Sequence, residues 1–151
     1  MSRTPAWVET ALERDGLPID VQIPSDVRFI ERVVDLVARG CAARDFPPRA
    51  CRLQVPVALT EAMSNAILYG NGADARKAVR VRAEVTERAL VLEVFDEGSG
   101  FDLAASLREP TEDNALERED GRGLFLMSRL MDRVECFTDG GSMVRMTLHR
   151  A

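Results

Sequence analysis

Short turns join two pairs of alternating segments, and this pattern limits most strongly what the chain can fold into. The first pair is AVRVRAEV at 78–85 and LVLEVFD at 90–96, separated by TERA. The second pair is VECFT at 134–138 and MVRMTLH at 143–149, which flank an Asp-Gly-Gly turn. Alternation with a short connection is typical of an antiparallel hairpin that buries one face. The sequence therefore predicts two hairpins.

A further strand and two helices are predicted before the first hairpin. LPIDVQIP at 17–24 alternates like a strand, and Ser25 is the expected N-cap of the helix that follows. A second helix is predicted to begin at Pro48, run toward Tyr69 and stop at Gly70. Pro56 lies inside it and is expected to kink it or delay its regular part, because proline lacks an N–H. The apolar positions expected to face the core in these two helices are Phe29, Ile30, Val33, Val34, Val37, Cys41, Leu53, Val57, Leu59, Met63, Ala66 and Ile67.

The order of these elements predicts the fold class. A strand, two helices, a hairpin, a long loop, a helix and a hairpin indicate an α+β domain, with a single-layer mixed, mostly antiparallel sheet covered on one face by helices. This order differs from the alternating βα pattern of a doubly wound nucleotide-binding fold. We expect residues 1–16 to be an N-terminal extension and 17–151 to form one domain.

Charge and composition narrow the function classes. The net charge of −5 provides no basic field for direct nucleic-acid binding. No apolar run approaches the ~20 residues of a membrane span, and the N-terminus has no apolar signal region. The three cysteines fit neither a disulfide framework nor a zinc site, so we expect them to be reduced in a cytoplasmic protein.

The first chemical signal is TEAMSNAILYGN at 60–71. Glu61 and Asn65 are four residues apart, so they share one face of the predicted helix. They form either a polar pair facing solvent, or a carboxylate that handles a proton beside an amide oxygen that holds Mg²⁺. Magnesium commonly takes one or two protein oxygens together with waters and substrate phosphates, so a lone amide ligand is compatible with it.

The second signal is VFDEGSGFD at 94–102. Asp96 ends a strand, and Gly98 and Gly100 follow. A P-loop would require Gly-Lys-Ser/Thr, and an EF-hand would require spaced acids; neither is present. The stretch is either a tight turn or a base pocket, in which the carboxylate accepts a hydrogen bond from an exocyclic amine such as that of adenine.

The third signal is GRGLFL at 121–126. Gly121 and Gly123 are predicted to form a turn that enters a helix, so its free N–H groups could face an anion, with Arg122 adding charge. The alternative is an ordinary helix start. The preceding segment, Leu103–Asp120, is highly charged and lacks a period, which is typical of a functional or mobile loop.

Together these signals resemble the N, G1 and G2 boxes of the GHKL ATPase superfamily, and the chain is similar to bacterial anti-sigma factors that are serine-protein kinases. The resemblance rests on LTEAMSNAILYGN, VFDEGSGFD, GRGLFLMSRLMDRVE and GGSMVRMTL. It implies ATP and Mg²⁺ as cofactors. It further implies that Glu61 is the general base, that Asn65 holds Mg²⁺, that Asp96 binds the adenine amino group and that Ser142 supports the adenine site.

The remaining positions follow from the same resemblance. Gly98 and Gly100 would lie beside the base, Gly121 and Gly123 would approach the phosphates, and Leu103–Asp120 would be a lid over ATP. Arg122 as a phosphate contact is inferred from its charge and place. The sequence departs from the pattern at Tyr69, where many members carry histidine, and at Pro56.

The partners implied are a sigma factor, which is held inactive, and an anti-anti-sigma protein of the STAS type, which is phosphorylated on serine or threonine. A homodimer is also implied. Two alternatives stay open: a nucleotide-binding sequestering or switch protein without kinase activity, and a stress-switch kinase that acts on a scaffold protein.

Overall fold

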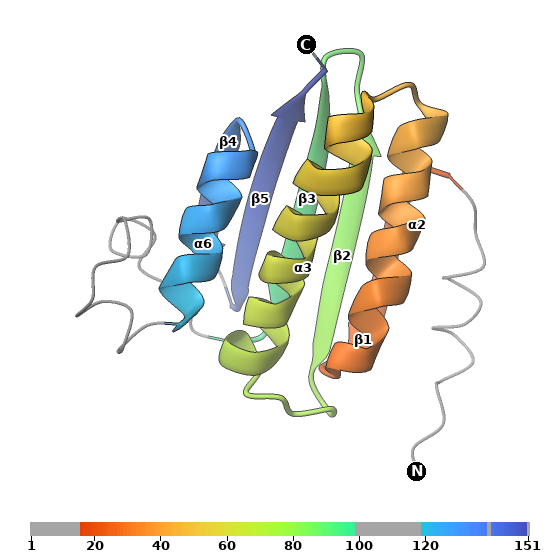
Figure 1. The fold of residues 1–151 in the computed structure, drawn as a ribbon. Coiled ribbons are helices and arrows are strands. Elements are labelled where there is room, and N and C mark those ends of the chain that lie inside the picture. Colours follow the sequence, from red (N-terminus) through yellow and green to blue (C-terminus); the bar gives the residue numbers. More distant parts are fainter. Residues whose placement is uncertain (1–15, 99–118, 139, 151) are drawn as a thin grey trace.

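A computed structural model describes residues 16–98, 119–138 and 140–150, and for 119–122 it describes the backbone alone. Figure 1 shows the fold, in which helices cover one face of a single sheet. The elements along the chain are β1 (Ile19–Pro24), η1 (Val27–Phe29), α2 (Ile30–Ala43), η2 (Ala50–Gln54), α3 (Val55–Asn65), η3 (Ala66–Gly70), β2 (Ala78–Val85), β3 (Ala89–Asp96), α6 (Glu119–Leu130), β4 (Arg133–Thr138) and β5 (Ser142–His149).

The sheet has five strands in the order β1-β2-β3-β5-β4, and every pairing among the described strands is antiparallel. Both predicted hairpins are confirmed, as β2–β3 and β4–β5. The predicted α+β class is confirmed, with α2, α3 and α6 side by side on one face of the sheet (Figure 1). The β3–β5 register pairs Asp96 with Ser142, which brings two predicted site residues together at one end of the sheet.

The core lies between the sheet and the helices. In β2, β3 and β5 alternate residues are buried, because successive side chains of a strand point to opposite faces. All six positions predicted for the first helix are buried, five of them in α2 and Phe29 at the end of η1. The largest fully buried side chains are Phe29, Ile23, Leu36, Leu59, Met63, Ile67, Leu90, Leu92, Leu124, Met127 and Met146.

The predicted N-cap of the first helix is wrong by one residue. The cap is Asp26, whose side chain accepts a hydrogen bond from the Arg28 N–H at the start of the short η1 turn. Ser25 is instead buried, and its hydroxyl donates to the Lys77 carbonyl over 2.7 Å. Ser25 therefore ties the end of β1 to the residue before β2.

The second helix runs as predicted but contains wide turns at both ends. η2 and η3 are π-helical and flank the regular α3, and the N–H of Val55 bonds to the carbonyl of Ala50 five residues back. The π turn precedes Pro56, so the missing N–H falls in the first turn of α3. A wide turn also shifts the helix phase, which explains why Leu53, predicted to face the core, is 39% exposed.

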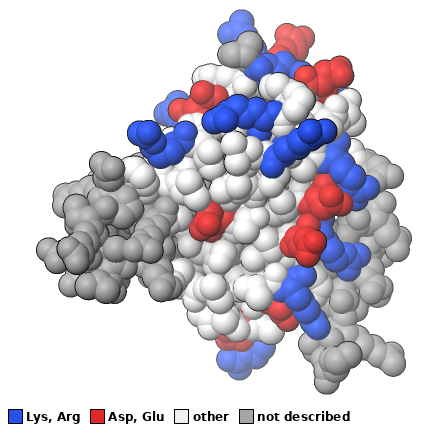
Figure 2. All heavy atoms as spheres, viewed as in Figure 1, with Lys and Arg blue, Asp and Glu red and all other residues white. Residues whose placement is uncertain are grey.

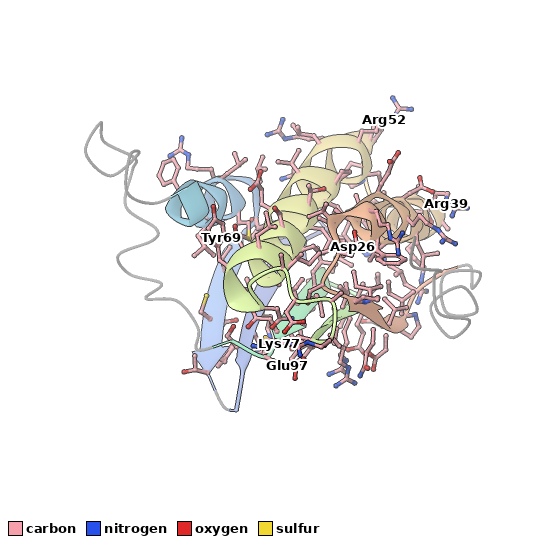
Figure 3. All side chains as sticks on the ribbon, turned by 90° about the horizontal axis from the view of Figure 1, so that it is seen from below. Asp26, Arg39, Arg52, Tyr69, Lys77 and Glu97 are labelled. Carbon is pink, nitrogen blue, oxygen red and sulfur yellow. The ribbon has the colours of Figure 1, made fainter. Side chains whose placement is uncertain are left out.

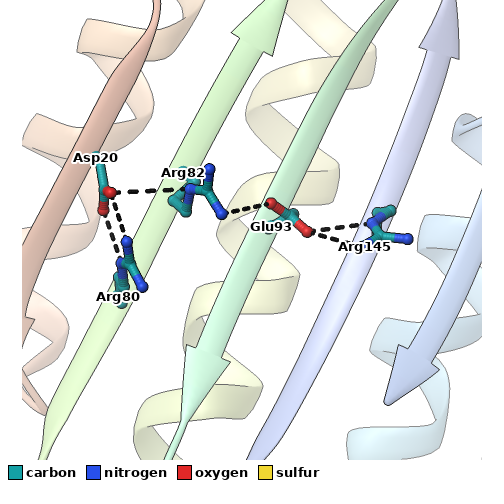
Figure 4. A network of polar contacts seen from close by, with 5 residues as sticks. All are labelled: Asp20, Arg80, Arg82, Glu93 and Arg145. Atoms are coloured by element: carbon teal, nitrogen blue, oxygen red, sulfur yellow. Dashed lines mark hydrogen bonds and ion pairs between the residues drawn. The ribbon is translucent and has the colours of Figure 1, made fainter.

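The face of the sheet away from the helices carries a chain of ion pairs across four strands (Figure 4). Arg80 and Arg82 contact Asp20, Arg82 also contacts Glu93, and Glu93 pairs with Arg145. The hydrogen bond from Arg80 lowers the pKa of Asp20. These pairs join neighbouring strands, and the ones that are well exposed add little stability.

The helix-covered face has a different distribution of charged side chains. Figure 2 shows charged side chains of both signs around a largely uncharged centre, with Lys and Arg gathered toward the end where α2 stops. Within the described parts of the chain, no helix is both long and apolar enough to cross a bilayer.

Candidate functional site

The site begins at Asp96, the last residue of β3. Strand alternation turns its side chain to the helix-covered face, where it is only 9% exposed. Its Oδ1 accepts hydrogen bonds from the Ser142 hydroxyl and from the Gly98 N–H, both over 2.7 Å. Oδ2 accepts none from any described residue. The carboxylate is therefore held in a fixed orientation by one oxygen.

Glycines surround this carboxylate because no side chain would fit. A Cβ at Gly70 would overlap the carboxylate of Asp96, and one at Gly98 would overlap the carbonyl oxygen of Gly70. A Cβ at Gly141 would lie 2.5 Å from the Asp96 carbonyl oxygen. The end of η3, the turn after β3 and the β4–β5 hairpin thus meet as bare backbone around one buried acid.

A second group of residues forms where α3 meets α6. Glu61 and Asn65 share one face of α3, as their spacing predicts, and Gly123 of α6 lies against both. A Cβ at Gly123 would be 2.9 Å from Asn65 Nδ2 and 2.9 Å from Glu61 Oε2. The side chain of Gln54 donates to the Leu130 carbonyl over 2.9 Å, which fastens the other end of α6 to the same helical run.

The amide of Asn65 is the polar group in this region that the protein leaves unsatisfied. Asn65 is 4% exposed, and its Nδ2 is the only fully buried side-chain nitrogen or oxygen among the described residues that lacks a hydrogen-bond partner. Such atoms are costly unless a ligand satisfies them. Because the two ends of an amide are exchangeable by rotation, Oδ1 can take the same position. In one orientation the Asn65 amide therefore fits a phosphate oxygen through Nδ2, and in the other it fits a metal ion through Oδ1.

The two groups are joined by η3. Its first residue follows Asn65 and its last, Gly70, touches Asp96, so roughly one π-helical turn separates them. Both lie at the same end of the molecule, on the face covered by helices (Figure 1). The arrangement can hold an elongated ligand with an amine at Asp96 and anionic groups near Asn65.

The glycine turn predicted at the phosphate end differs from the structure, and several other predicted site residues are not described by it. α6 begins at Glu119, so Gly121 and Gly123 lie within its first turns, and the predicted glycine turn before the helix is wrong. The helix starts early because charged residues before the glycines extend it, while glycine only lowers helix propensity. The Arg122 side chain, Gly100 and residues 103–118 of the expected lid lie outside what the structure describes.

Three further residues lie at this site. Gly70 was predicted only as the end of the second helix, and no sequence signal singles out Asn71 or Cys136. Burial raises the pKa of the Cys136 thiol to about 11, and the charge of Asp96 adds to the rise. Asn71 has a hydrogen bond to the residue after Asp96. The close approach of Gly70 to Asp96 is a long-range contact, and YGN alone carries no signal for it.

Departures from the expected pattern leave this geometry intact. Tyr69, at the position where the resembling family often carries histidine, lies in η3 and is 47% exposed. Pro56 precedes Glu61 by more than one turn, and the π turn before it absorbs the irregularity. The helix therefore still presents Glu61 and Asn65 together.

Comparisons with known proteins show which family the chain matches. Residues 23–148 match the family described as "Histidine kinase-like ATPase domain". The chain is 35% identical to "Serine-protein kinase RsbW" of Bacillus licheniformis and 30% identical to the protein of that name from Bacillus velezensis, over 85% of this chain and 83% of each relative. It is 33% identical to "Anti-sigma F factor" of Clostridium perfringens, over 56% of this chain and 61% of the relative.

Proposed function

The chain belongs to the family of histidine kinase-like ATPase domains, and on that premise we propose that it is an ATP-dependent serine/threonine-protein kinase and anti-sigma factor. It sequesters a sigma factor and phosphorylates an anti-anti-sigma protein of the STAS type. Relatives named for the kinase activity and for the anti-sigma activity support both parts. We further propose that it acts as a homodimer in the cytoplasm.

One observation carries the proposal. A single helical run, α3 with η3, bears Glu61 and Asn65 beside Gly123 and ends with Gly70 against Asp96. The adenine amino group donates to the Asp96 carboxylate, and Ser142 holds that carboxylate in place. Gly98 lies beside the base, and Gly100 continues the same backbone. The triphosphate then runs along η3 toward Asn65, Gly121 and Gly123.

Asn65 and Glu61 divide the chemistry of transfer. Asn65 is the protein ligand for Mg²⁺, which neutralises charge on the phosphates when it is bound. Glu61 orients the serine or threonine hydroxyl of the partner and accepts its proton as the oxygen bonds to the γ-phosphorus and ADP leaves. Arg122 contacts a phosphate oxygen, and Leu103–Asp120, apart from its last two residues in α6, covers the nucleotide as a lid.

Two substitutions test the assignment of roles. Glu61→Gln should leave ATP affinity within about twofold and reduce phosphoryl transfer by at least ~100-fold, because it removes the proton acceptor but keeps the shape. Asp96→Asn should weaken ATP binding by about tenfold or more, since an amide cannot reproduce all the hydrogen bonds of the carboxylate. The measurements are calorimetric ATP titration and transfer of labelled phosphate to a STAS-type partner. Glu84→Gln, on an exposed position of β2, is the matched control.

A nucleotide-gated sequestering protein without transfer is the second candidate. It would bind ATP and the sigma factor and label no STAS-type or scaffold partner, and Glu61→Gln would then change nothing. The proximity of the Glu61 carboxylate to Asn65, through Gly123, favours the kinase. Wild-type protein that binds no ATP would refute both candidates.

A further inference from the structure

Asn71 is a buried amide whose side chain joins three loops. It follows η3 directly and is 2% exposed. Its Nδ2 donates to Ser25 Oγ over 2.8 Å and to the Ala78 carbonyl over 3.0 Å. Its Oδ1 accepts from the Glu97 N–H over 2.7 Å. Both donor hydrogens and the acceptor are in use, so the side chain has one well-defined orientation.

The bond to Glu97 matters because Glu97 is the residue between Asp96 and Gly98. Ser142 and Gly98 hold the carboxylate of Asp96, while Asn71 holds the backbone of the next residue. The Glu97 carboxylate also accepts from the Ala78 N–H over 2.8 Å. Figure 3, seen from below, shows Lys77 and Glu97 next to each other. The turn after β3 is thus fastened to the loop before β2.

The loop that carries Asn71 is itself anchored. The Asn71 N–H donates to the Ala66 carbonyl over 2.9 Å, so the residue closes the last π turn of η3. Ser25 donates to the Lys77 carbonyl through both its N–H and its hydroxyl. These bonds therefore fix the position of Glu97 relative to the end of η3, which belongs to the same helical run as Asn65.

We propose that Asn71 is a positioning residue for the nucleotide site: it sets the Asp96 carboxylate relative to η3 and so controls selection of the adenine base. This inference rests on the proposed function, in which Asp96 receives the adenine amine. Gly70 contacts the Asp96 carboxylate so closely that the end of η3 and the turn after β3 cannot approach further. The turn must therefore be held at one fixed distance from η3. The Oδ1 contact with Glu97 is what holds it there.

Only an amide supplies this combination of contacts. A carboxylate at position 71 could still accept from the Glu97 N–H but could not donate to the Ala78 carbonyl, and alanine could do neither. Asn71→Asp thus keeps the contact with the Asp96 turn and loses the contacts with the scaffold. Ser25→Ala is a matched control, because it disturbs the same buried cluster without touching Glu97.

The test compares these three variants with the wild type in the full chain. The first readout is hydrogen exchange of the Glu97 amide without nucleotide, which is independent of any activity. Asn71→Ala should speed this exchange at least tenfold relative to Ser25→Ala, and Asn71→Asp should retain most of the protection. The second readout is the ratio of the dissociation constants for GTP and ATP.

Loss of the tether should weaken ATP binding by about fivefold to tenfold and GTP binding by much less, so base discrimination falls. A general loss of folding would instead weaken both nucleotides equally. If Asn71→Ala and Ser25→Ala match in exchange and in the GTP/ATP ratio, the positioning role is wrong. Another outcome is that the wild type binds no ATP while the exchange of the Glu97 amide changes among the variants as expected. That outcome would refute the proposed function and the role in base selection, but not the hydrogen bond from Glu97 to Asn71 as a tether.

Discussion

Replacing Gly123 by alanine should lower the rate of phosphoryl transfer without lowering the stability of the fold. The added Cβ would lie 2.9 Å from both Asn65 Nδ2 and Glu61 Oε2, whereas ordinary contact begins near 3.4 Å. The two side chains must therefore move by about 0.5 Å. A misplacement of about 1 Å in a catalytic group costs ~100-fold in rate, so half of that displacement predicts a reduction of about tenfold in phosphoryl transfer.

The free energy of unfolding of Gly123→Ala should rise slightly or stay unchanged. Gly123 lies inside α6, and alanine is favoured over glycine in a helix by up to about 1 kcal/mol, which offsets the strain of the new contact. Transfer to a STAS-type partner at saturating ATP gives the rate, and thermal unfolding gives Tm. Adding Asn65→Ala removes one of the two clashing groups, so the double variant should bind ATP no more weakly than Asn65→Ala alone. A Gly123→Ala protein with wild-type transfer would show that Gly123 does not constrain Glu61.

Two further substitutions test the packing around the site and the core. Gly70→Ala should abolish ATP binding and cost about 1–3 kcal/mol in urea unfolding, because its Cβ would overlap the Asp96 carboxylate; unchanged ATP titration would contradict the contact. Burial raises the pKa of Cys41 to about 12, so below pH 9 the native thiol and the unfolded thiol are both protonated. As pH rises from about 9 toward 12 only the unfolded chain loses the proton, and the free energy of unfolding should fall by up to about 1.4 kcal/mol per pH unit. The Cys41→Ala protein should show a flatter dependence between about pH 9 and 11, and parallel curves would rule out this linkage.

The strands and the main helices were predictable because each leaves a local signature. Alternation in 78–85 and 90–96 and the short turn between them dictate a hairpin, whatever the rest of the chain does. The errors fall where two local signals compete. Ser25 and Asp26 are both good caps, and the choice was decided by Asn71 and Lys77, which are far away in the sequence. Leu53 was misassigned because a π turn changes the helical phase without changing the composition.

The candidate site was predictable only as separate pieces. The spacing of Glu61 and Asn65 and the position of Asp96 at a strand end are visible in the sequence, and the structure brings them to one end of the sheet. The contacts that join the pieces are not visible, because they are made by backbone and by a residue that looks like part of a loop. Gly70 is needed for a contact with a carboxylate 26 positions away, and Asn71 for an amide equally distant in sequence.

In the proposed function, the residues that carry out the chemistry are not the residues that set the distances between them. Under that proposal Glu61, Asn65 and Asp96 supply the chemistry, but none of them fixes its distance to the others. That distance is set where η3 meets the turn after β3, by Gly70, which permits close approach, and by Asn71, which prevents separation. A ligand that spans from Asp96 to Asn65 must match the length of η3. Substitutions at this junction should therefore change which nucleotide binds, whereas substitutions at Glu61 should change only what happens to it.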